Sequence, residues 1–260
     1  MDEQPKRTLL EAFERLADII EILRAPGGCP WDREQTHASL QPCLIEEVHE
    51  AVEAIDEENM DALEEELGDL LTLIALHAQI AAEAEEFTLL SLLNKNNAKL
   101  IRRHAHVFGE RKAETAADAL NSWERVKRSE PGYESRASAL DGVPKSLPAL
   151  MAASALQKKA ARAGFEWRDA SSRGDSKIQL KLNSDDPVEE IQKKIGEALF
   201  ELASAARLLG VDPEAALRQA NAQFQRRFRE IEKMRDDAER EDASFAELWK
   251  RAKEGGEDAD

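Results

Sequence analysis

The chain has 260 residues, of which 42% are hydrophobic and 34% charged, and its formal net charge at pH 7 is −17. This length allows one large domain or two small ones, with an ample core in either case. The acidic balance argues against a general surface for nucleic acid or anionic lipid, so we expect no stable nucleic-acid binding. Only 5% of the residues are aromatic, whereas Ala, Leu, Glu, Lys and Arg are plentiful, and this composition predicts an all-α fold.

The sequence indicates neither membrane insertion nor disulfide bonding. The chain opens without a signal-peptide pattern, and its most apolar segment, residues 70–82, contains polar residues and is too short to span a bilayer. We therefore expect a cytoplasmic protein with no membrane partner. Cys29 and Cys43 are too few for a disulfide framework, which indicates ordinary reduced thiols.

Two amphipathic helices are predicted in the first third of the chain. Apolar residues recur with i, i+3, i+4 spacing over residues 44–55 and again over residues 63–74. Residues 56–61 between them lack apolar periodicity, and either Asn59 or Asp61 is suited to cap a new helix. The pattern predicts a tight antiparallel helical hairpin.

Both predicted helices carry acidic motifs. Glu46, Glu47 and Glu50 form the pattern EExxE on the first helix, and Glu66 and Asp69 form ExxD on the second. Glu47 and Glu50 lie about 100° and 160° to one side of their apolar stripe, and the ExxD pair lies roughly 85° and 145° to the same side of its own. In an antiparallel pair, flanks of matching phase meet on one edge, and both cross-helix pairs are centred on the turn. The sequence therefore predicts that the carboxylates of Glu47, Glu50, Glu66 and Asp69 converge.

Four converging carboxylates favour a bound cation, because unit charges ~4 Å apart repel by ~1 kcal/mol in water and ~4 kcal/mol at a surface-like dielectric. Carboxylate oxygens without paired His or Cys ligands suit a hard ion, so Mg²⁺ or Mn²⁺ is the expected cofactor. A solvated acidic face without a metal is the alternative in a chain this rich in Glu. The matched phases and the shared centre favour the metal site.

A weak internal repeat indicates two related domains. Residues 67–71 (LGDLL) recur at 195–199 (IGEAL), and residues 97–104 (NAKLIRRH) recur at 221–228 (NAQFQRRF). A stretch punctuated by Gly and Pro separates the two copies. We predict a first helical domain, a linker and a second helical domain over residues 1–128, 129–148 and 149–260.

The second copy lacks the acidic motifs. Lys194 and Glu197 stand where Glu66 and Asp69 stand in the first copy, and no EExxE precedes them. Residues 178–182, between two segments rich in helix breakers, alternate like a strand or an extended loop. The second domain is therefore interpreted as degenerate, with a structural or regulatory role.

Short motifs run through the chain in a specific order. They are GCPWD (28–32), QT (35–36), ELGDLL (66–71), RRHAHVF (102–108), WERVK (123–127), PKSLPAL (144–150), GFEW (164–167) and FQRRFR (224–229), together with EExxE. In this order they resemble the MazG family of nucleoside triphosphate pyrophosphohydrolases over almost the whole chain. Two departures are Ala105, where the family usually has proline, and the missing metal motif of the second domain.

The resemblance implies two tandem all-α MazG-type domains and cleavage of a nucleoside triphosphate to the monophosphate and pyrophosphate with Mg²⁺. Glu47, Glu50, Glu66 and Asp69 would hold the ion, which neutralises phosphate oxygens and lowers the pKa of a bound water. Glu46 is the candidate catalytic residue that orients or deprotonates this water, the alternative being a solvated helix residue. Since the second domain lacks the motif, the first is expected to be active.

Basic residues are candidates for binding the triphosphate. Lys95 and Lys99 lie one turn apart on a predicted helix, which Arg102 and Arg103 continue. This pattern indicates a basic strip that faces the acidic one, and an ordinary salt-bridged helix surface is the alternative.

Two tryptophans are the aromatic candidates for substrate binding. Trp123 resembles the position that family members place near the nucleotide, and Trp31 is expected near the site entrance. The alternative for both is the core, where large aromatic residues are more often found. His49 is expected on the surface, because the chain has a single Glu-x-x-His unit and di-iron bundles need two.

Two other functions stay open at the level of sequence. One is a narrower pyrophosphatase of the dUTP or dCTP type, as in related all-α dimeric dUTPases, and the other is a non-enzymatic helical interaction or regulatory module. A filled metal site raises the melting temperature, whereas the non-enzymatic module predicts no Mg²⁺-dependent change. The resemblance also implies a homodimer, in which the hairpins of two copies form a four-helix bundle.

Overall fold

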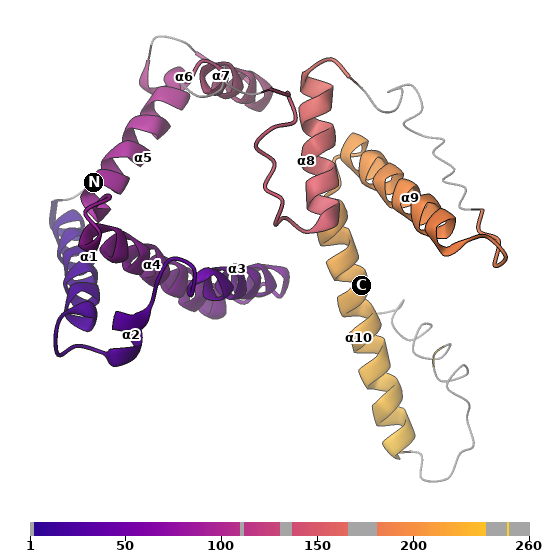
Figure 1. Ribbon diagram of the computed structural model, residues 1–260, viewed down its shortest axis with the longest axis horizontal. Coiled ribbons are helices and arrows are strands. Elements are labelled where there is room, and N and C mark those ends of the chain that lie inside the picture. Colours follow the sequence, from indigo (N-terminus) through magenta and orange to yellow (C-terminus); the bar gives the residue numbers. More distant parts are fainter. Residues whose placement is uncertain (1–2, 110–111, 131–136, 166–180, 238–248, 250–260) are drawn as a thin grey trace. The chain divides into compact units, whose positions relative to one another are not determined.

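The computed structural model describes residues 3–109, 112–130, 137–165, 181–237 and 249. Every regular element in those residues is a helix, so the predicted all-α fold is confirmed (Figure 1). The chain divides into two compact units, Met1–Glu134 and Ser135–Asp260. Within the described ranges, no helix combines the length and apolar character needed to cross a membrane.

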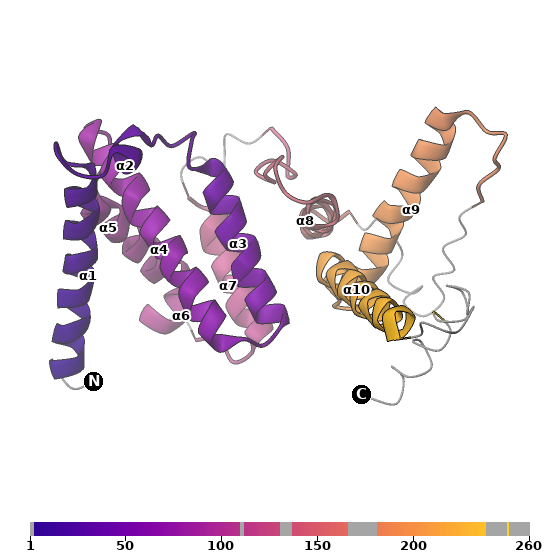
Figure 2. The same ribbon diagram turned by 90° about the horizontal axis from the view of Figure 1, so that it is seen from below.

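The first unit is built around one long central helix, α4. This helix packs against α1 on one side and α3 on the other (Figure 2), and α5 leads away from it toward α6 and α7 (Figure 1). The helices described in this unit are α1 (Glu3–Arg24), α2 (Pro30–Glu34), α3 (Gln41–Asp56), α4 (Met60–Glu83), α5 (Leu89–Arg103), α6 (Ala105–Phe108) and α7 (Ala116–Arg128).

The turn between α3 and α4 fixes the register of their hairpin. Glu58 adopts the left-handed conformation, with φ 55°, and its amide donates to the Ile55 carbonyl at 3.1 Å. The Asn59 amide donates to the Ala54 carbonyl at 2.9 Å, and together these bonds close α3 in a Schellman motif. Asn59 Oδ1 then accepts from the Ala62 amide at 3.2 Å and caps α4. The two predicted helices and their tight turn are confirmed.

A small apolar core holds this hairpin against α1. Leu40 is fully buried at the N-terminal cap of α3, where it joins residues of α1 and of the second half of α4. Cys43 packs against the same cluster and, like Cys29, is a free thiol, as predicted. The buried members of the cluster are Ile20, Leu40, Leu73, Ala75 and Leu76.

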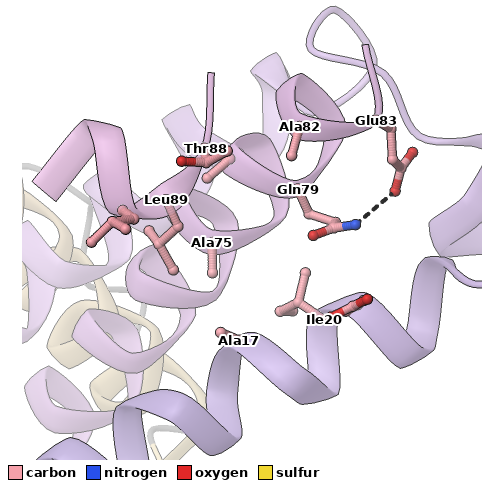
Figure 3. A pocket seen from close by; sticks show the side chains of 11 residues that line it. Ala17, Ile20, Ala75, Gln79, Ala82, Glu83, Thr88 and Leu89 are labelled. Atoms are coloured by element: carbon pink, nitrogen blue, oxygen red, sulfur yellow. Dashed lines mark hydrogen bonds between the residues drawn. The ribbon is translucent and has the colours of Figure 1, made fainter. Parts of the chain in front are cut away.

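Arg24 ties the end of α1 to α2 and α4. Its guanidinium donates from Nε and Nη2 to the two carboxylate oxygens of Glu83, at 2.8 and 2.7 Å, and its Nη1 donates to the carbonyls of Asp32 and Gln35. The Arg24 side chain is only 6% exposed, and its hydrogen bonds lower the pKa of the Glu83 carboxyl. A groove of about 410 Å³ between α1, α4 and the start of α5 lies beside this pair (Figure 3).

Capping boxes stabilise the N-terminal ends of α5 and α7. Thr88 Oγ1 accepts from the Ser91 amide at the start of α5, and Thr115 Oγ1 accepts from the Asp118 amide at the start of α7, both at 3.1 Å. With its ends fixed in this way, α7 packs against α5 and α6. This packing brings the C-terminal ends of α5 and α7 together.

The second unit contains α8 (Ala149–Arg162), α9 (Val188–Leu208) and α10 (Pro213–Asp237), which pack on one another. Gln157 Nε2 donates to the Phe200 carbonyl at 2.8 Å and joins α8 to α9. Of the alternating segment 178–182, residues 178–180 lie outside the described residues, and Lys181 and Leu182 have no regular structure. The predicted domain limits and the degeneracy of the second copy stay predictions.

Leu40→Ala is expected to lower the free energy of unfolding by about 2–5 kcal/mol, because it removes a fully buried side chain and leaves a cavity. Urea unfolding followed by circular dichroism measures this loss. Leu9→Ala is the matched control: Leu9 is 66% exposed on α1, so its change should stay within about 0.5 kcal/mol. Equal losses for the two variants would show that Leu40 does not anchor the core.

Candidate functional site

The acidic motifs meet on one edge of the α3–α4 hairpin. Glu47 lies on α3, and Glu66 and Asp69 lie on α4. One carboxylate oxygen from each of these residues lies within 4.8 Å of the other two. Among the described residues, none of the three forms an ion pair with Lys or Arg. The hairpin therefore concentrates negative charge that no Lys or Arg of the described part of the chain neutralises through an ion pair.

Glu50, the fourth carboxylate predicted to converge, is not among the three that lie within 4.8 Å of one another, but its charge interacts with theirs. Desolvation raises the pKa of the Glu50 carboxyl, and the charges of neighbouring carboxylates, chiefly Glu66, raise it further. The pKa of Glu47 is raised by desolvation and then by the charges of Asp69 and Glu50. Both shifts have the sign expected for carboxylates gathered without a compensating cation.

Glu46 and His49 lie on the exposed part of α3. The charge of Glu46 contributes to the raised pKa of Glu50, which places it at the edge of the acidic cluster. His49 is exposed, as the sequence predicted. Glu46 is thus an exposed carboxylate whose charge interacts with the cluster.

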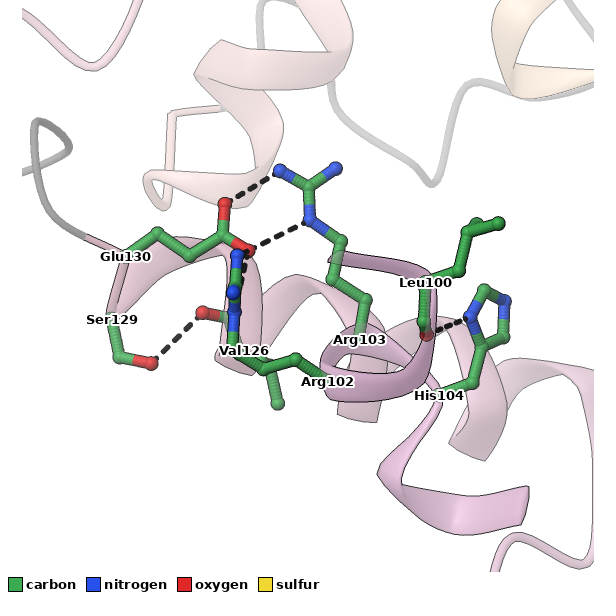
Figure 4. A network of polar contacts seen from close by, with 7 residues as sticks. All are labelled: Leu100, Arg102, Arg103, His104, Val126, Ser129 and Glu130. Carbon is green, nitrogen blue, oxygen red and sulfur yellow. Dashed lines mark hydrogen bonds and ion pairs between the residues drawn. The ribbon is translucent and has the colours of Figure 1, made fainter. Parts of the chain in front are cut away.

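Arg102 and Arg103 converge on one carboxylate that sequence reasoning missed (Figure 4). Arg102 Nη2 and Arg103 Nη2 donate to the two oxygens of Glu130, each at 2.6 Å. Glu130 lies just beyond the end of α7, 27 residues from Arg103 in sequence. No local pattern indicates this pairing, because it arises only when α7 packs on α5.

The ring of Trp123 on α7 lies near two cations, Arg103 of α5 and Lys127 of α7. The Arg103 Cζ atom is 5.1 Å from the centre of the Trp123 ring, and the Lys127 Nζ atom is 4.7 Å from it. Such distances allow cation–π attraction. Lys127 was not among the sequence candidates, although its position one turn after Trp123 on a helix was a signal that could have found it.

The remaining substrate candidates lie apart from these contacts. Lys95 is exposed and Lys99 half-buried on α5, and Trp31 is 58% exposed on α2 rather than in the core. The side-chain hydrogen bonds of Arg102 and Arg103 end on Glu130 and not on the acidic cluster. The described contacts thus assemble an acidic group on α3 and α4 and a separate basic and aromatic group on α5 and α7.

Lys194 of the second unit, which the internal repeat predicts to correspond to Glu66, has carboxylate partners. Lys194 Nζ forms ion pairs with Asp186 at 2.6 Å and with Glu190 at 2.9 Å. Glu197 is exposed and lies 3.9 Å from Lys193. Lys194 thus already supplies a positive charge to its neighbouring carboxylates in the second unit.

Comparison with known proteins agrees with this arrangement. The family model of the MazG nucleotide pyrophosphohydrolase domain matches residues 35–108, which include α3, α4 and α5. A Thermotoga maritima protein named nucleoside triphosphate pyrophosphohydrolase/pyrophosphatase MazG is 40% identical over 253 residues, covering 94% of this chain and 97% of the relative. The chain belongs to the MazG family of nucleotide pyrophosphohydrolases.

Other relatives support the same assignment. An Escherichia coli protein named nucleoside triphosphate pyrophosphohydrolase is 38% identical to this MazG-family chain over 236 residues, covering 86% of it and 89% of the relative. The resemblance inferred from the order of short motifs is thus confirmed, and with it the enzyme class, a hydrolase of phosphoanhydrides.

Without a bound metal, Glu47→Gln is expected to raise the free energy of unfolding at pH 7.5 by about 1 kcal/mol. The substitution removes the repulsion between Glu47 and the neighbouring carboxylates of Asp69 and Glu50. The folded-state pKa of Glu47 lies above its ordinary value of 4.5. The favourable contribution of its protonated form is therefore present below pH 4.5 and lost as the pH rises. Urea unfolding in EDTA at pH 7.5 and pH 4 measures the difference, which should vanish at the lower pH.

The matched control is Glu53→Gln, which alters an exposed glutamate of α3 outside the cluster. This variant should change stability little at either pH. A gain equal to that of Glu47→Gln would mean that the effect reflects the overall net charge rather than the cluster.

Proposed function

We propose that the first unit binds Mg²⁺ or Mn²⁺ and hydrolyses the bond between the α- and β-phosphates of ribo- or deoxynucleoside triphosphates, giving the monophosphate and pyrophosphate. The observation that carries this proposal is the convergence of Glu47, Glu66 and Asp69 within 4.8 Å. A donor set made only of carboxylate oxygens fits a hard divalent cation. Relatives named nucleoside triphosphate pyrophosphohydrolases support the substrate class.

The acidic residues have two roles in this proposal. Glu47, Glu50, Glu66 and Asp69 would hold the cation. When bound, the ion neutralises phosphate oxygens and lowers the pKa of a coordinated water. Glu46 orients the attacking water and accepts its proton, because it is exposed at the edge of the cluster.

The basic and aromatic residues bind the substrate. Lys95, Lys99, Arg102 and Arg103 donate to phosphate oxygens and offset their negative charge. Trp123 offers an aromatic face beside the nucleotide, with Lys127 adding a positive charge next to it. Trp31 lies at the site entrance, a position that agrees with its exposure on α2.

The active form is proposed to be a homodimer. The hairpin exposes large apolar side chains that the single chain leaves uncovered, although the sequence pattern assigned them to the packed stripes. Several exposed large apolar side chains on one hairpin are suited to pack against another protein surface. A second hairpin packed on this face would complete a four-helix bundle. The exposed residues are Ile45, Val48 and Ile55 on α3 and Leu67, Leu71 and Ile74 on α4.

The second unit is proposed to have a structural or regulatory role within limits close to residues 149–260. Its Lys194 is already paired with Asp186 and Glu190. A cation at the position of a metal ligand repels a divalent ion, which supports an active site in the first unit alone.

Glu50→Gln is expected to lower kcat/KM for nucleoside triphosphates by about 100-fold or more, because it removes a charged ligand of the ion. The assay incubates the full chain with a panel of ribo- and deoxynucleoside triphosphates and MgCl₂ and quantifies monophosphate and pyrophosphate. Release of diphosphate and orthophosphate would contradict the proposed bond specificity. Hydrolysis of dUTP or dCTP alone would favour a pyrophosphatase of narrower specificity. If no nucleotide were hydrolysed, the result would favour a non-enzymatic interaction or regulatory module.

Glu197→Gln is the matched control in the second unit, since Glu197 is exposed and close only to Lys193 among its recorded ion pairs. This variant should turn over nucleotide like the unaltered chain. If Glu197→Gln lost activity and Glu50→Gln kept it, the active site would lie in the second unit and not in the first.

Ile45→Asp is expected to convert the dimer to a monomer, because it places a charge in the apolar interface. Ile45 is 58% exposed in the single chain, so the substitution should not disturb the hairpin itself. Sedimentation equilibrium should show a mass near 29.0 kDa for the variant and about twice that for the unaltered chain. Leu209→Asp alters an exposed leucine of the second unit and should stay dimeric. A monomeric unaltered chain would contradict the proposal.

A further inference from the structure

The side chains of Arg102, Arg103 and Glu130 form one connected group (Figure 4). Arg102 donates from Nη2 and Nε to Oε1 of Glu130, at 2.6 and 3.2 Å. Arg103 donates from Nε to Oε1 at 3.0 Å and from Nη2 to Oε2 at 2.6 Å. The Glu130 carboxylate thus accepts four N–H bonds from two guanidinium groups.

This convergence is not a property of the helix that carries the arginines. Consecutive residues of an α-helix point about 100° apart, so their side chains do not face a common point. Two guanidinium charges also repel each other at short distance. A single carboxylate at the end of α7 overcomes both effects and draws the two groups together. Glu130 is suited to this because its side chain is only 15% exposed, which limits competition from water.

The charge of Glu130 persists over a wide pH range. Hydrogen bonds from Arg103 and Arg102 lower the pKa of its carboxyl to about 2. The group of three therefore carries one net positive charge near neutral pH. This net charge attracts an anion, and the Glu130 carboxylate reduces the repulsion between the two guanidinium groups.

Each arginine keeps one edge available. The hydrogen bonds to Glu130 use Nε and Nη2 of each guanidinium, and among the described residues no recorded bond uses Nη1 of Arg102 or Arg103. Arg103 is fixed further by the ring of Trp123, 5.1 Å from its Cζ atom. Each guanidinium thus retains its Nη1 group as a hydrogen-bond donor, and guanidinium groups are well suited to recognise phosphate oxygens.

We infer that Glu130 is a positioning residue that gathers Arg102 and Arg103 into a two-arginine clamp for the phosphate chain of the nucleotide. The clamp donates from the Nη1 edges, and Glu130 contacts the arginines and not the substrate. This inference rests on the proposed function, since the same arginines are proposed there to bind phosphate. It adds the residue that orients them and the surface of each guanidinium that the phosphate contacts.

Glu130→Gln tests the clamp. Gln keeps the size of the side chain but loses the charge that holds two guanidinium groups, so KM should rise about tenfold while kcat stays within about twofold. A loss confined to folding would instead reduce the active fraction and leave KM unchanged. Glu114→Gln is the matched control, because Glu114 is an exposed glutamate just before α7 and its KM should not change.

A double-mutant cycle separates positioning from general damage. In an Arg102→Ala, Arg103→Ala background, Glu130→Gln should have no further effect on KM, because the groups that it positions are gone. An additive increase in that background would overturn the inference. A lower KM in Glu130→Gln alone would also overturn it, since Glu130 would then compete with phosphate for the arginines.

Binding of tripolyphosphate keeps this test independent of turnover. Calorimetry of the full chain with Mg²⁺-free tripolyphosphate should show about tenfold weaker binding for Glu130→Gln than for Glu114→Gln. If the unaltered chain hydrolyses no nucleotide, the proposed function fails and this titration still decides on the clamp. If it hydrolyses nucleotides but both KM and tripolyphosphate affinity are unchanged in Glu130→Gln, only the clamp is wrong.

Discussion

Electrostatic repulsion among the carboxylates of the α3–α4 hairpin is the constraint on which the rest of the first unit depends. Glu47, Glu66 and Asp69 place oxygens within 4.8 Å of one another, at a cost of about 1 kcal/mol for each pair exposed to water. Burial of one large apolar side chain contributes about 1.5–3 kcal/mol, so a small core can hold such a cluster. The cluster is therefore stable only because packing elsewhere fixes the two helices.

The packing that resists this repulsion lies at both ends of the hairpin. At one end, the Schellman motif at Glu58 and the Asn59 cap fix the turn and hence the register of the acidic residues. At the other end, Leu40 anchors the start of α3 in the core, and Arg24 joins α1 to Glu83 at the end of α4. The packing energy of these contacts thus offsets the repulsion between the carboxylates. Such a destabilising arrangement is typical of a functional site.

The sequence predicted the elements whose causes are local. Apolar periodicity predicted the two helices, the lack of it predicted the turn, and Asn59 was one of two predicted caps. Phase along each helix predicted which acidic residues share an edge. The same reasoning assigned Ile45 and Val48 to a packed stripe, whereas the single chain leaves them exposed, because periodicity indicates an apolar face without indicating what covers it.

Contacts between distant segments could not be predicted in this way. Arg24 and Glu83 are 59 residues apart, and Arg102 and Glu130 are 28 residues apart. Each residue taken alone is an ordinary charged surface residue, and only the packing of whole helices selects its partner. The basic strip was predicted from one helix, but its geometry depends on a carboxylate from another. This is why the acidic half of the candidate site was easier to derive than the basic half.

The two units balance their charges in different ways, and the contrast bears on where a metal ion can act. In the second unit, Lys194 lies between Asp186 and Glu190 and supplies the positive charge from within the chain. In the first unit, the sequence repeat predicts Glu66 at the corresponding position, and no described cation pairs with it. A lysine ammonium cannot dissociate from its site or bind a phosphate and a water at the same time, whereas a divalent ion can. An acidic residue at this position, in place of a lysine, removes a positive charge from within the chain. The remaining carboxylates are then stabilised by a cation from solution. This contrast supports the proposal that a divalent ion binds at the α3–α4 hairpin of the first unit and not in the second unit.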